Sequence, residues 1–205
     1  MTRLLHIVAS PRAERSRSGA VAERLIAALP NMEVETLDLF RTDLPPFDGA
    51  VIDARYALIN AEPVPAGALS DWRAVEQRIA HFLSFDHWLI STPMWNFGVP
   101  YRLKHYIDVL TQPGLAFSVT PDGMVEGKAK GTAIILAAGA LDTRPGGPLA
   151  ALDHQVAYLQ SWLGFIGVSD VRSIRIQPTY GAPEVVEVAM QAAFAEADAL
   201  VATLG

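Results

Sequence analysis

The segment Ser10-Pro11-Arg12-Ala13-Glu14-Arg15-Ser16-Arg17-Ser18 brings three hydroxyl groups and three guanidinium groups together. It follows an apolar run at 4–9 and opens an amphipathic stretch at 18–29, which predict a strand and a helix. Hydroxyls, guanidinium groups and the unpaired N–H groups of a helix start together suit a phosphate dianion. The alternative is that Ser18 only caps the helix while the arginines are solvated. Without Walker A or Gly-x-Gly-x-x-Gly spacing, the segment favours a phosphate monoester.

A second segment, Thr92-Pro93-Met94-Trp95-Asn96-Phe97-Gly98-Val99-Pro100, is a predicted loop with unusually large apolar side chains. Met94, Trp95 and Phe97 surround one polar side chain, Asn96. Because loops are usually polar, this composition favours a flat apolar ligand with a hydrogen-bonding edge. An isoalloxazine ring has that character. The alternative is a buried turn whose aromatic rings join the core.

Apolar strands alternate with amphipathic helices around these two segments, which predicts a doubly wound, five-stranded parallel sheet with helices on both faces, α/β in class. The expected strands are 4–9, 33–39, 87–91, 132–137 and 171–175. The expected helices are 18–29 ending at Pro30, 70–85 with Ser70 as N-cap, 101–111, 149–163 and 183–204, with a weakly helical stretch at 51–60. An excursion at 113–127 carries the turn signal Pro121-Asp122-Gly123. Such sheets bind ligands beyond the carboxyl ends of their strands, so the loops after the first, third and fourth strands are expected to hold the site.

Composition narrows the function classes. The chain has 205 residues, 51% of them hydrophobic, which suits a single domain over 1–205. A net charge of −6 makes a nucleic-acid partner unexpected, and the lack of cysteine excludes disulfides and thiolate nucleophiles. The five histidines show no metal-ligand spacing. No apolar run approaches a membrane span, so a cytoplasmic protein without a membrane partner is expected.

Several segments resemble the FMN-dependent NADH-azoreductases, a branch of the flavodoxin-like quinone reductases. They are Ser10, Ser16-Arg17-Ser18, Pro93-Met94-Trp95-Asn96-Phe97 and Leu163-Gly164-Phe165-Ile166-Gly167, in the same order over almost the whole chain. The resemblance implies that Ser10, Ser16, Arg17 and Ser18 hold the FMN phosphate. It also implies that Met94, Trp95, Asn96 and Phe97 lie along the flavin, with Trp95 where tyrosine is common.

One turn departs from that family. The family often has a Ser-Arg-Gly-Gly type turn after the fourth strand, where this chain has Ala137-Ala138-Gly139-Ala140. Gly139 still allows a close backbone approach to the flavin. The resemblance further implies a homodimer with the active site at the interface, and a substrate pocket to which Phe117 contributes. Tyr101 and Tyr106 are interpreted as packing residues.

The resemblance implies ping-pong hydride transfer, in which flavin N5 takes hydride from NADH or NADPH and passes it to a quinone or azo compound. No protein side chain is required as a catalytic acid or nucleophile, because the cofactor is the redox centre. The alternative is a flavodoxin-type electron carrier without direct NAD(P)H oxidation, against which the excursion and the modest charge argue. A receiver domain would need an aspartate where the chain has Ser91 and Thr92, and a low-molecular-weight tyrosine phosphatase would need a cysteine.

Overall fold

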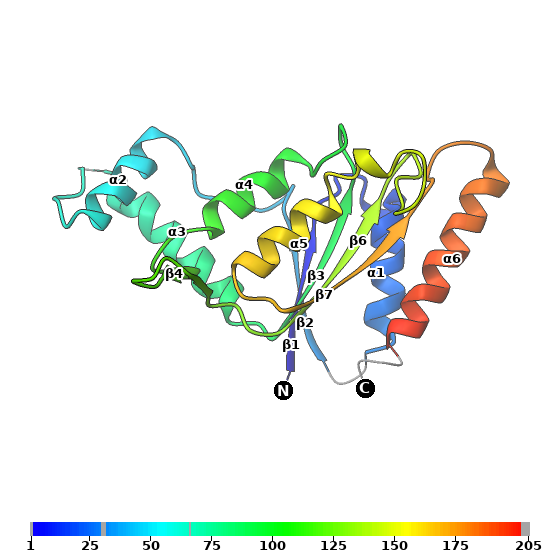
Figure 1. The fold of residues 1–205 in the computed structure, drawn as a ribbon, viewed down its shortest axis with the longest axis horizontal. Helices are drawn as coiled ribbons and strands as arrows, with labels where there is room; N and C mark the ends of the chain where they lie inside the picture. Colours follow the sequence, from blue (N-terminus) through cyan, green and yellow to red (C-terminus); the bar gives the residue numbers. More distant parts are fainter. Residues whose placement is uncertain (1, 30–31, 66, 202–205) are drawn as a thin grey trace.

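The computed structural model describes residues 2–29, 32–65 and 67–201, which form a five-stranded sheet, a two-stranded hairpin and the helices around them (Figure 1). The strands are β1 (Thr2–Val8), β2 (Met32–Asp38), β3 (His87–Pro93), the hairpin strands β4 (Phe117–Val119) and β5 (Val125–Gly127), β6 (Thr132–Ala138) and β7 (Asp170–Ile176). The helices are α1 (Arg17–Ala27), α2 (Gly49–Ile59), α3 (Ala68–Leu83), α4 (Tyr101–Leu110), α5 (Val156–Phe165) and α6 (Pro183–Val201). Two 3₁₀ turns, η1 (Ala13–Arg15) and η2 (Ala150–Leu152), precede α1 and α5.

The described strands of the large sheet are parallel and ordered β2-β1-β3-β6-β7. Starting from β1, the chain moves outward to β2 and then returns to the other side of β1 to form β3. Strand order therefore reverses between β1 and β3, where Val8 pairs with Ser91 near the carboxyl ends. The predicted α/β fold class is confirmed, and its ligand-binding edge lies at this reversal.

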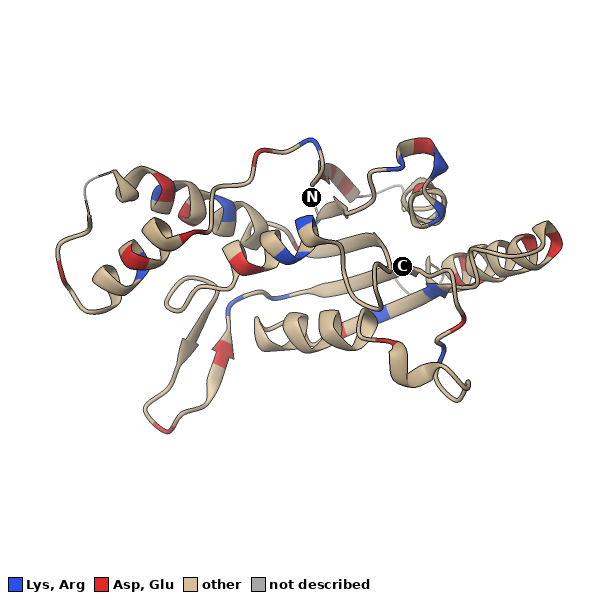
Figure 2. Ribbon diagram, turned by 90° about the horizontal axis from the view of Figure 1, so that it is seen from above, with Lys and Arg blue, Asp and Glu red and all other residues tan. Residues whose placement is uncertain are grey.

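Both faces of the sheet are covered by helices, as the apolar strands predict. Helices α1 and α6 lie on one side, and α3, α4 and α5 lie on the other (Figure 1). Alternate residues of one strand therefore enter different cores: Leu4 packs on the α1 and α6 side, and Leu5 on the opposite side. Charged positions lie mainly on helices, loops and strand ends (Figure 2).

Some predicted boundaries are wrong for a local reason. Helix α3 begins at Ala68 after Gly67, whose φ of 88° no other residue adopts as easily, and Ser70 donates a hydrogen bond to the Gly67 carbonyl instead of capping the helix. The helix predicted over 149–163 is divided, because Asp153 Oδ1 accepts the N–H groups of Gln155 and Val156 and starts α5 there.

Other boundaries agree with the expectation. The excursion forms the hairpin β4–β5, and Gly123 at its turn has a φ of 84°. The expected helix ends at Pro30 and Leu204 lie outside the described residues.

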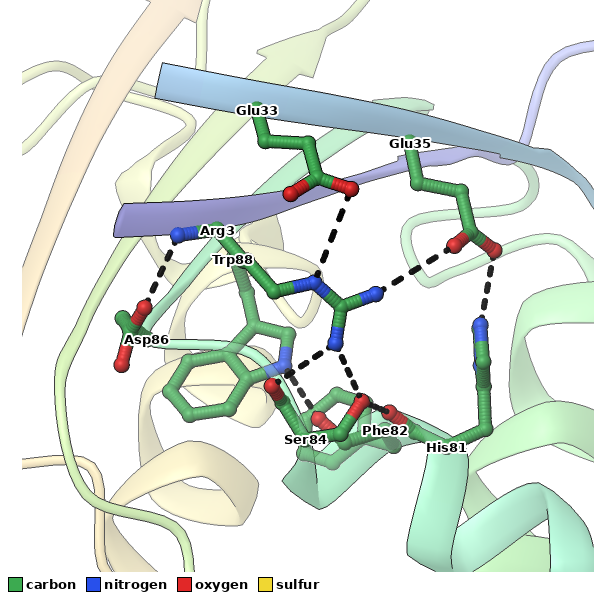
Figure 3. A network of polar contacts seen from close by, with 8 residues as sticks. All are labelled: Arg3, Glu33, Glu35, His81, Phe82, Ser84, Asp86 and Trp88. Atoms are coloured by element: carbon green, nitrogen blue, oxygen red, sulfur yellow. Dashed lines mark hydrogen bonds and ion pairs between the residues drawn. The ribbon is translucent and has the colours of Figure 1, made fainter. Parts of the chain in front are cut away.

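Polar contacts fix the sheet at the edge opposite the reversal (Figure 3). The Arg3 N–H donates to Asp86 Oδ2 at 2.8 Å, and its guanidinium donates to the Ser84 carbonyl at 3.1 Å. The same guanidinium lies 3.7 Å from Glu35 Oε2, and His81 Nε2 lies 2.7 Å from Glu35 Oε1. One arginine thus connects β1, β2 and the turn from α3 into β3.

A buried histidine sits between β1 and β3. His6 is 6% exposed, and its Nε2 lies 2.8 Å from the Ser91 hydroxyl. Burial penalises the imidazolium, so it lowers the pKa of His6 from 6.5 to about 4. The neutral imidazole is therefore the form that the folded core contains near neutral pH.

Acid should destabilise the protein through this residue. In the unfolded chain His6 takes up its proton near pH 6.5, but in the folded chain only near pH 4, so stability is lost as pH falls between these values. The full loss is roughly 3 kcal/mol. Denaturant unfolding at pH 7 and pH 4.5 should show a smaller pH dependence for His6→Asn than for the wild type. The exposed His154→Asn is the matched control, and an equal pH dependence in all three proteins would contradict this expectation.

Candidate active site

The serine-rich loop after β1 places its hydroxyls at the start of α1. Ser16 is the N-cap: its Oγ accepts the N–H of Gly19 at 3.1 Å and lies 3.3 Å from the hydroxyl of Ser18. Ser10, Ser16 and Ser18 are all buried. The interpretation of Ser18 as the cap is therefore wrong, because the helix starts one residue earlier than expected. In the part of the chain that the structure describes, Ser18 does not accept a helix N–H, and its hydroxyl shares a hydrogen bond with that of Ser16.

Three arginines without an ion-pair partner among the described residues lie on this loop and at the start of α1. Arg12, Arg15 and Arg17 are exposed, and within residues 2–29, 32–65 and 67–201 none of them has a carboxylate at ion-pair distance. The N–H groups of Arg17 and Ser18 also have no partner in the same ranges. A cleft of about 520 Å³ opens here, lined by Arg12, Glu14, Arg15, Ser16, Arg17, Ala20, Thr179 and Tyr180. Unpaired guanidinium and N–H groups around one cleft suit an anion.

The loop after β3 is a tight two-residue turn. Trp95 and Gly98 exchange N–H···O=C hydrogen bonds, each 3.0 Å long. Between them Asn96 has a φ of 48° and Phe97 a φ of 71°, the two positive values of a type I′ turn. Asparagine tolerates this conformation, whereas phenylalanine is strained in it. Asn96 is exposed, so its amide is not the buried group that an apolar loop suggests.

This turn decides which backbone N–H groups can reach a ligand. The Met94 N–H donates to the Ala138 carbonyl at 2.6 Å, and the Trp95 N–H is used within the turn. In the described part of the chain, the N–H groups of Asn96 and Phe97 have no acceptor. The Phe97 carbonyl accepts the N–H of His154 at 3.1 Å, which holds the turn against the start of α5. Two adjacent donors are thus free at the reversal of strand order.

The loop after β6 is hydrogen-bonded to the end of β7 and to the segment that follows it. The Gly139 N–H donates to the Ile176 carbonyl at 3.1 Å, and the Gly139 carbonyl accepts from Thr179 at 2.8 Å. A Cβ on Gly139 would lie 2.8 Å from Gln177 Nε2. Gln177 is buried, and its Oε1 accepts the N–H of Thr143 at 2.9 Å. The glycine therefore permits a close approach of Gln177, which sequence reasoning missed, and its own N–H is not available to a ligand.

A second groove beside α6, of about 570 Å³, is larger than the cleft at the serine loop. Among the described residues that line it, Arg144 carries the only cation, and its guanidinium hydrogen-bonds Asp142 at 2.6 and 2.9 Å. These hydrogen bonds lower the pKa of Asp142 to about 2, so the pair stays ionised and mutually neutralised. The groove therefore offers no free cation to a phosphate, and volume alone does not identify the site.

Two aromatic residues next to Trp95 were missed as site residues. The ring centroid of Phe40, after β2, lies 5.9 Å from those of both Trp95 and Tyr101. The Tyr101 and Trp95 centroids are 6.4 Å apart. Tyr106 is buried, as a packing residue should be, but Tyr101 is 66% exposed and does not join the core. The signal was in the sequence, since Phe40 directly follows a predicted strand, but only the fold brings it to Trp95.

Phe117 lies apart from the residues around Trp95 in the same chain. Its ring packs on that of Phe165 at 4.7 Å, at the last residue of α5. The turn containing Phe97 contacts His154, just before the first residue of α5. Ten helical residues rise about 15 Å, so Phe117 is roughly one helix length from the turn.

Two further observations limit the chemistry of the described residues. No three His, Cys, Asp or Glu side chains in the ranges 2–29, 32–65 and 67–201 are grouped so that they could hold a metal ion. Within the same ranges, no helix is long and apolar enough to cross a membrane.

Comparison with known proteins agrees with this geometry. A family model described as flavodoxin-like fold matches residues 2–201. FMN-dependent NADH:quinone oxidoreductase 3 of Pseudomonas fluorescens is 36% identical over 207 residues, which cover 98% of this chain and 96% of that protein. The chain belongs to this flavodoxin-like oxidoreductase family. The FMN-dependent NADH:quinone oxidoreductase of Desulfotalea psychrophila is 38% identical over 187 residues, covering 87% of this chain and 86% of that protein.

A solved member has the same architecture. The azoreductase of Bacillus anthracis superimposes with a TM-score of 0.88 at 26% identity, covering 98% of this chain and 99% of that one. The resemblance drawn from the sequence is confirmed at the level of family and fold.

The positive φ of Asn96 gives a stability prediction. Asn96→Ala should lower the free energy of unfolding by about 1 kcal/mol, because alanine disfavours the left-handed region, whereas Asn96→Gly should stay within about 0.5 kcal/mol of the wild type. Urea unfolding of the three proteins measures this. If both variants lose the same stability, the side chain rather than the backbone conformation holds the turn.

Proposed function

We propose that the chain binds FMN and transfers hydride from NADH or NADPH to quinones and azo compounds. One observation carries the proposal: unpaired cations with buried hydroxyls after β1, and two free N–H donors after β3, lie at the same reversal of strand order. The names of the relatives, which include NADH:quinone oxidoreductases and an azoreductase, support the same reading.

The serine-rich loop would hold the phosphate of FMN. The hydroxyls of Ser10, Ser16 and Ser18 are buried together at the loop, and a phosphate needs donors of this kind. Arg17 adds a cation at the first residue of α1, where the helix dipole also favours negative charge. The fit is supported by the free N–H groups of Arg17 and Ser18 in the described part of the chain.

The turn after β3 would hold the ring system. The free N–H groups of Asn96 and Phe97 can donate to the polar edge of a flavin, while Met94 and Trp95 offer apolar surface. When bound, FMN supplies the hydride-transfer chemistry itself, so the chain's task is to bind, orient and polarise. Donors fixed in advance near a developing negative charge stabilise it without reorganisation. Gly139 would contribute only the close packing of its loop, since its N–H is already used.

An electron carrier on the same fold is the competing function. The oxidoreductase names of relatives that align with almost the whole chain favour the enzyme. Residues 1–205 would act as one flavin-binding domain in the cytoplasm, with no nucleic-acid or membrane partner.

We further propose a homodimer with the active site at the interface. Phe117 lies about one helix length from the turn of its own chain, and this separation supports a pocket in which the Phe117 ring comes from a second copy. Sedimentation equilibrium should give twice the chain mass of 22.1 kDa. A monomer at micromolar concentration would exclude this arrangement.

The function is tested with the purified protein. It should be yellow, release FMN rather than FAD on heating, and oxidise NADH or NADPH when 1,4-benzoquinone is added. Cofactor identity is read by chromatography and NADH or NADPH oxidation by absorbance. Bound FMN without direct NADH or NADPH oxidation would favour the electron carrier, and FAD would contradict the monoester site.

Arg17→Ala should weaken FMN binding roughly 10- to 100-fold, because one charge-assisted hydrogen bond contributes about 1.5–3 kcal/mol. Arg73→Ala, an exposed arginine on α3, is the matched control and should bind FMN as the wild type does. Fluorescence titration of the apoprotein with FMN measures both. Equal affinities would mean that Arg17 is only solvated surface.

A further inference from the structure

Three rings from separate segments form an aromatic shelf, which consists of the half-buried Phe40 and the exposed Trp95 and Tyr101. Phe40 follows β2, Trp95 lies in the turn after β3, and Tyr101 is the first residue of α4. Phe40 meets Tyr101 edge-on at 89°, whereas the planes of Trp95 and Tyr101 are inclined by only 32°. The rings contact one another and extend the proposed flavin turn toward β2.

Trp95 and Tyr101 do not belong to the hydrophobic core. Trp95 is 37% exposed, whereas the other three tryptophans of the chain are buried. Tyr101 is the more exposed ring, and its hydroxyl has no hydrogen-bond partner within the described ranges. Exposed aromatic surface beside a candidate site is typical of ligand contact.

Side chains of α4 hold the segment that carries Phe40 in place. Arg102, next to Tyr101 on α4, donates to the Leu39 carbonyl at 2.7 Å and to the Thr42 carbonyl. His105 donates to the Pro45 carbonyl at 2.9 Å. Arg102 and His105 lie about one helical turn apart, and their bonds tie the segment after β2 to the start of α4, so Phe40 is held beside Tyr101. Rings fixed before a ligand arrives lose little entropy on contact.

We propose that the aromatic shelf selects electron acceptors with two fused rings over acceptors with one. The proposal rests on the proposed function, since the acceptor must reach the turn that contains Trp95. The shelf centroids are 5.9 to 6.4 Å apart, so one six-membered ring can cover only one of them well. A fused two-ring quinone has the area to contact Trp95 and Tyr101 together, and each added aromatic contact strengthens binding.

The test compares two acceptors in matched variants. Tyr101→Ala should lower kcat/KM for 1,4-naphthoquinone roughly 3- to 10-fold and that for 1,4-benzoquinone less than about 2-fold. Tyr101→Phe, which keeps the ring, should match the wild type for both. Val188→Ala removes an exposed apolar side chain on α6 and should change neither value. An equal loss for both acceptors, or no loss, would overturn the proposal.

A binding measurement separates the shelf from the reaction. 1-Naphthol and phenol take no hydride, so calorimetric titration of the FMN-loaded protein reports ring contact alone. The wild type should prefer 1-naphthol, and Tyr101→Ala should lose most of that preference while keeping its FMN. If the wild type fails to oxidise NADH or NADPH with any quinone, the proposed function fails, and this titration still decides the shelf. A halved sedimentation mass for Tyr101→Ala would assign the shelf to contact between two copies and overturn the proposal.

Discussion

The parallel pairing of β1 with β3 is the constraint on which the rest of the structure depends. From Leu4 against His87 to Val8 against Ser91, the two strands share a ladder at the centre of the sheet. After β1 the chain continues to β2 on one side of the pair, and after β3 it continues to β6 on the other side. The serine-rich loop and the turn at Trp95 are therefore brought to one edge by the same ladder. Disturbing that register would separate the two halves of the site.

The site also depends on which backbone groups the fold leaves unpaired. In the turn after β3, Trp95 and Gly98 satisfy each other, while Asn96 and Phe97 point their N–H groups elsewhere because both have positive φ. A positive φ is unfavourable for phenylalanine. A residue keeps such a conformation only where several surrounding contacts hold its backbone in place. Here those contacts are the Ala138 carbonyl on one side and His154 on the other. The strained turn is thus held by β6 and by the start of α5.

The alternation of apolar strands and amphipathic helices was enough to predict the fold and the two loops, because parallel sheets bury both faces of every inner strand. Sequence could not separate Ser16 from Ser18 as the cap, since the decision depends on a single turn of backbone. It also could not bring Phe40 to Trp95, because the segment that carries Phe40 is held to α4 by hydrogen bonds from Arg102 to the backbone carbonyls of Leu39 and Thr42. Every residue has a backbone carbonyl, so the sequence does not show which of them a side chain will reach.

Among the described residues, the loop after β6 offers few free polar groups to a ligand. Where the family often has polar side chains, this loop has alanines around Gly139, and its backbone is consumed by Ile176 and Thr179. Gln177 fills the space beside Gly139 and its Oε1 accepts the N–H of Thr143, so it stabilises the loop. In the described part of the chain, the free N–H donors beside Trp95 at the reversal of strand order are those of Asn96 and Phe97, not those of this loop. The acceptor selection proposed above therefore rests on aromatic surface, which the residues after β2 and at the start of α4 provide.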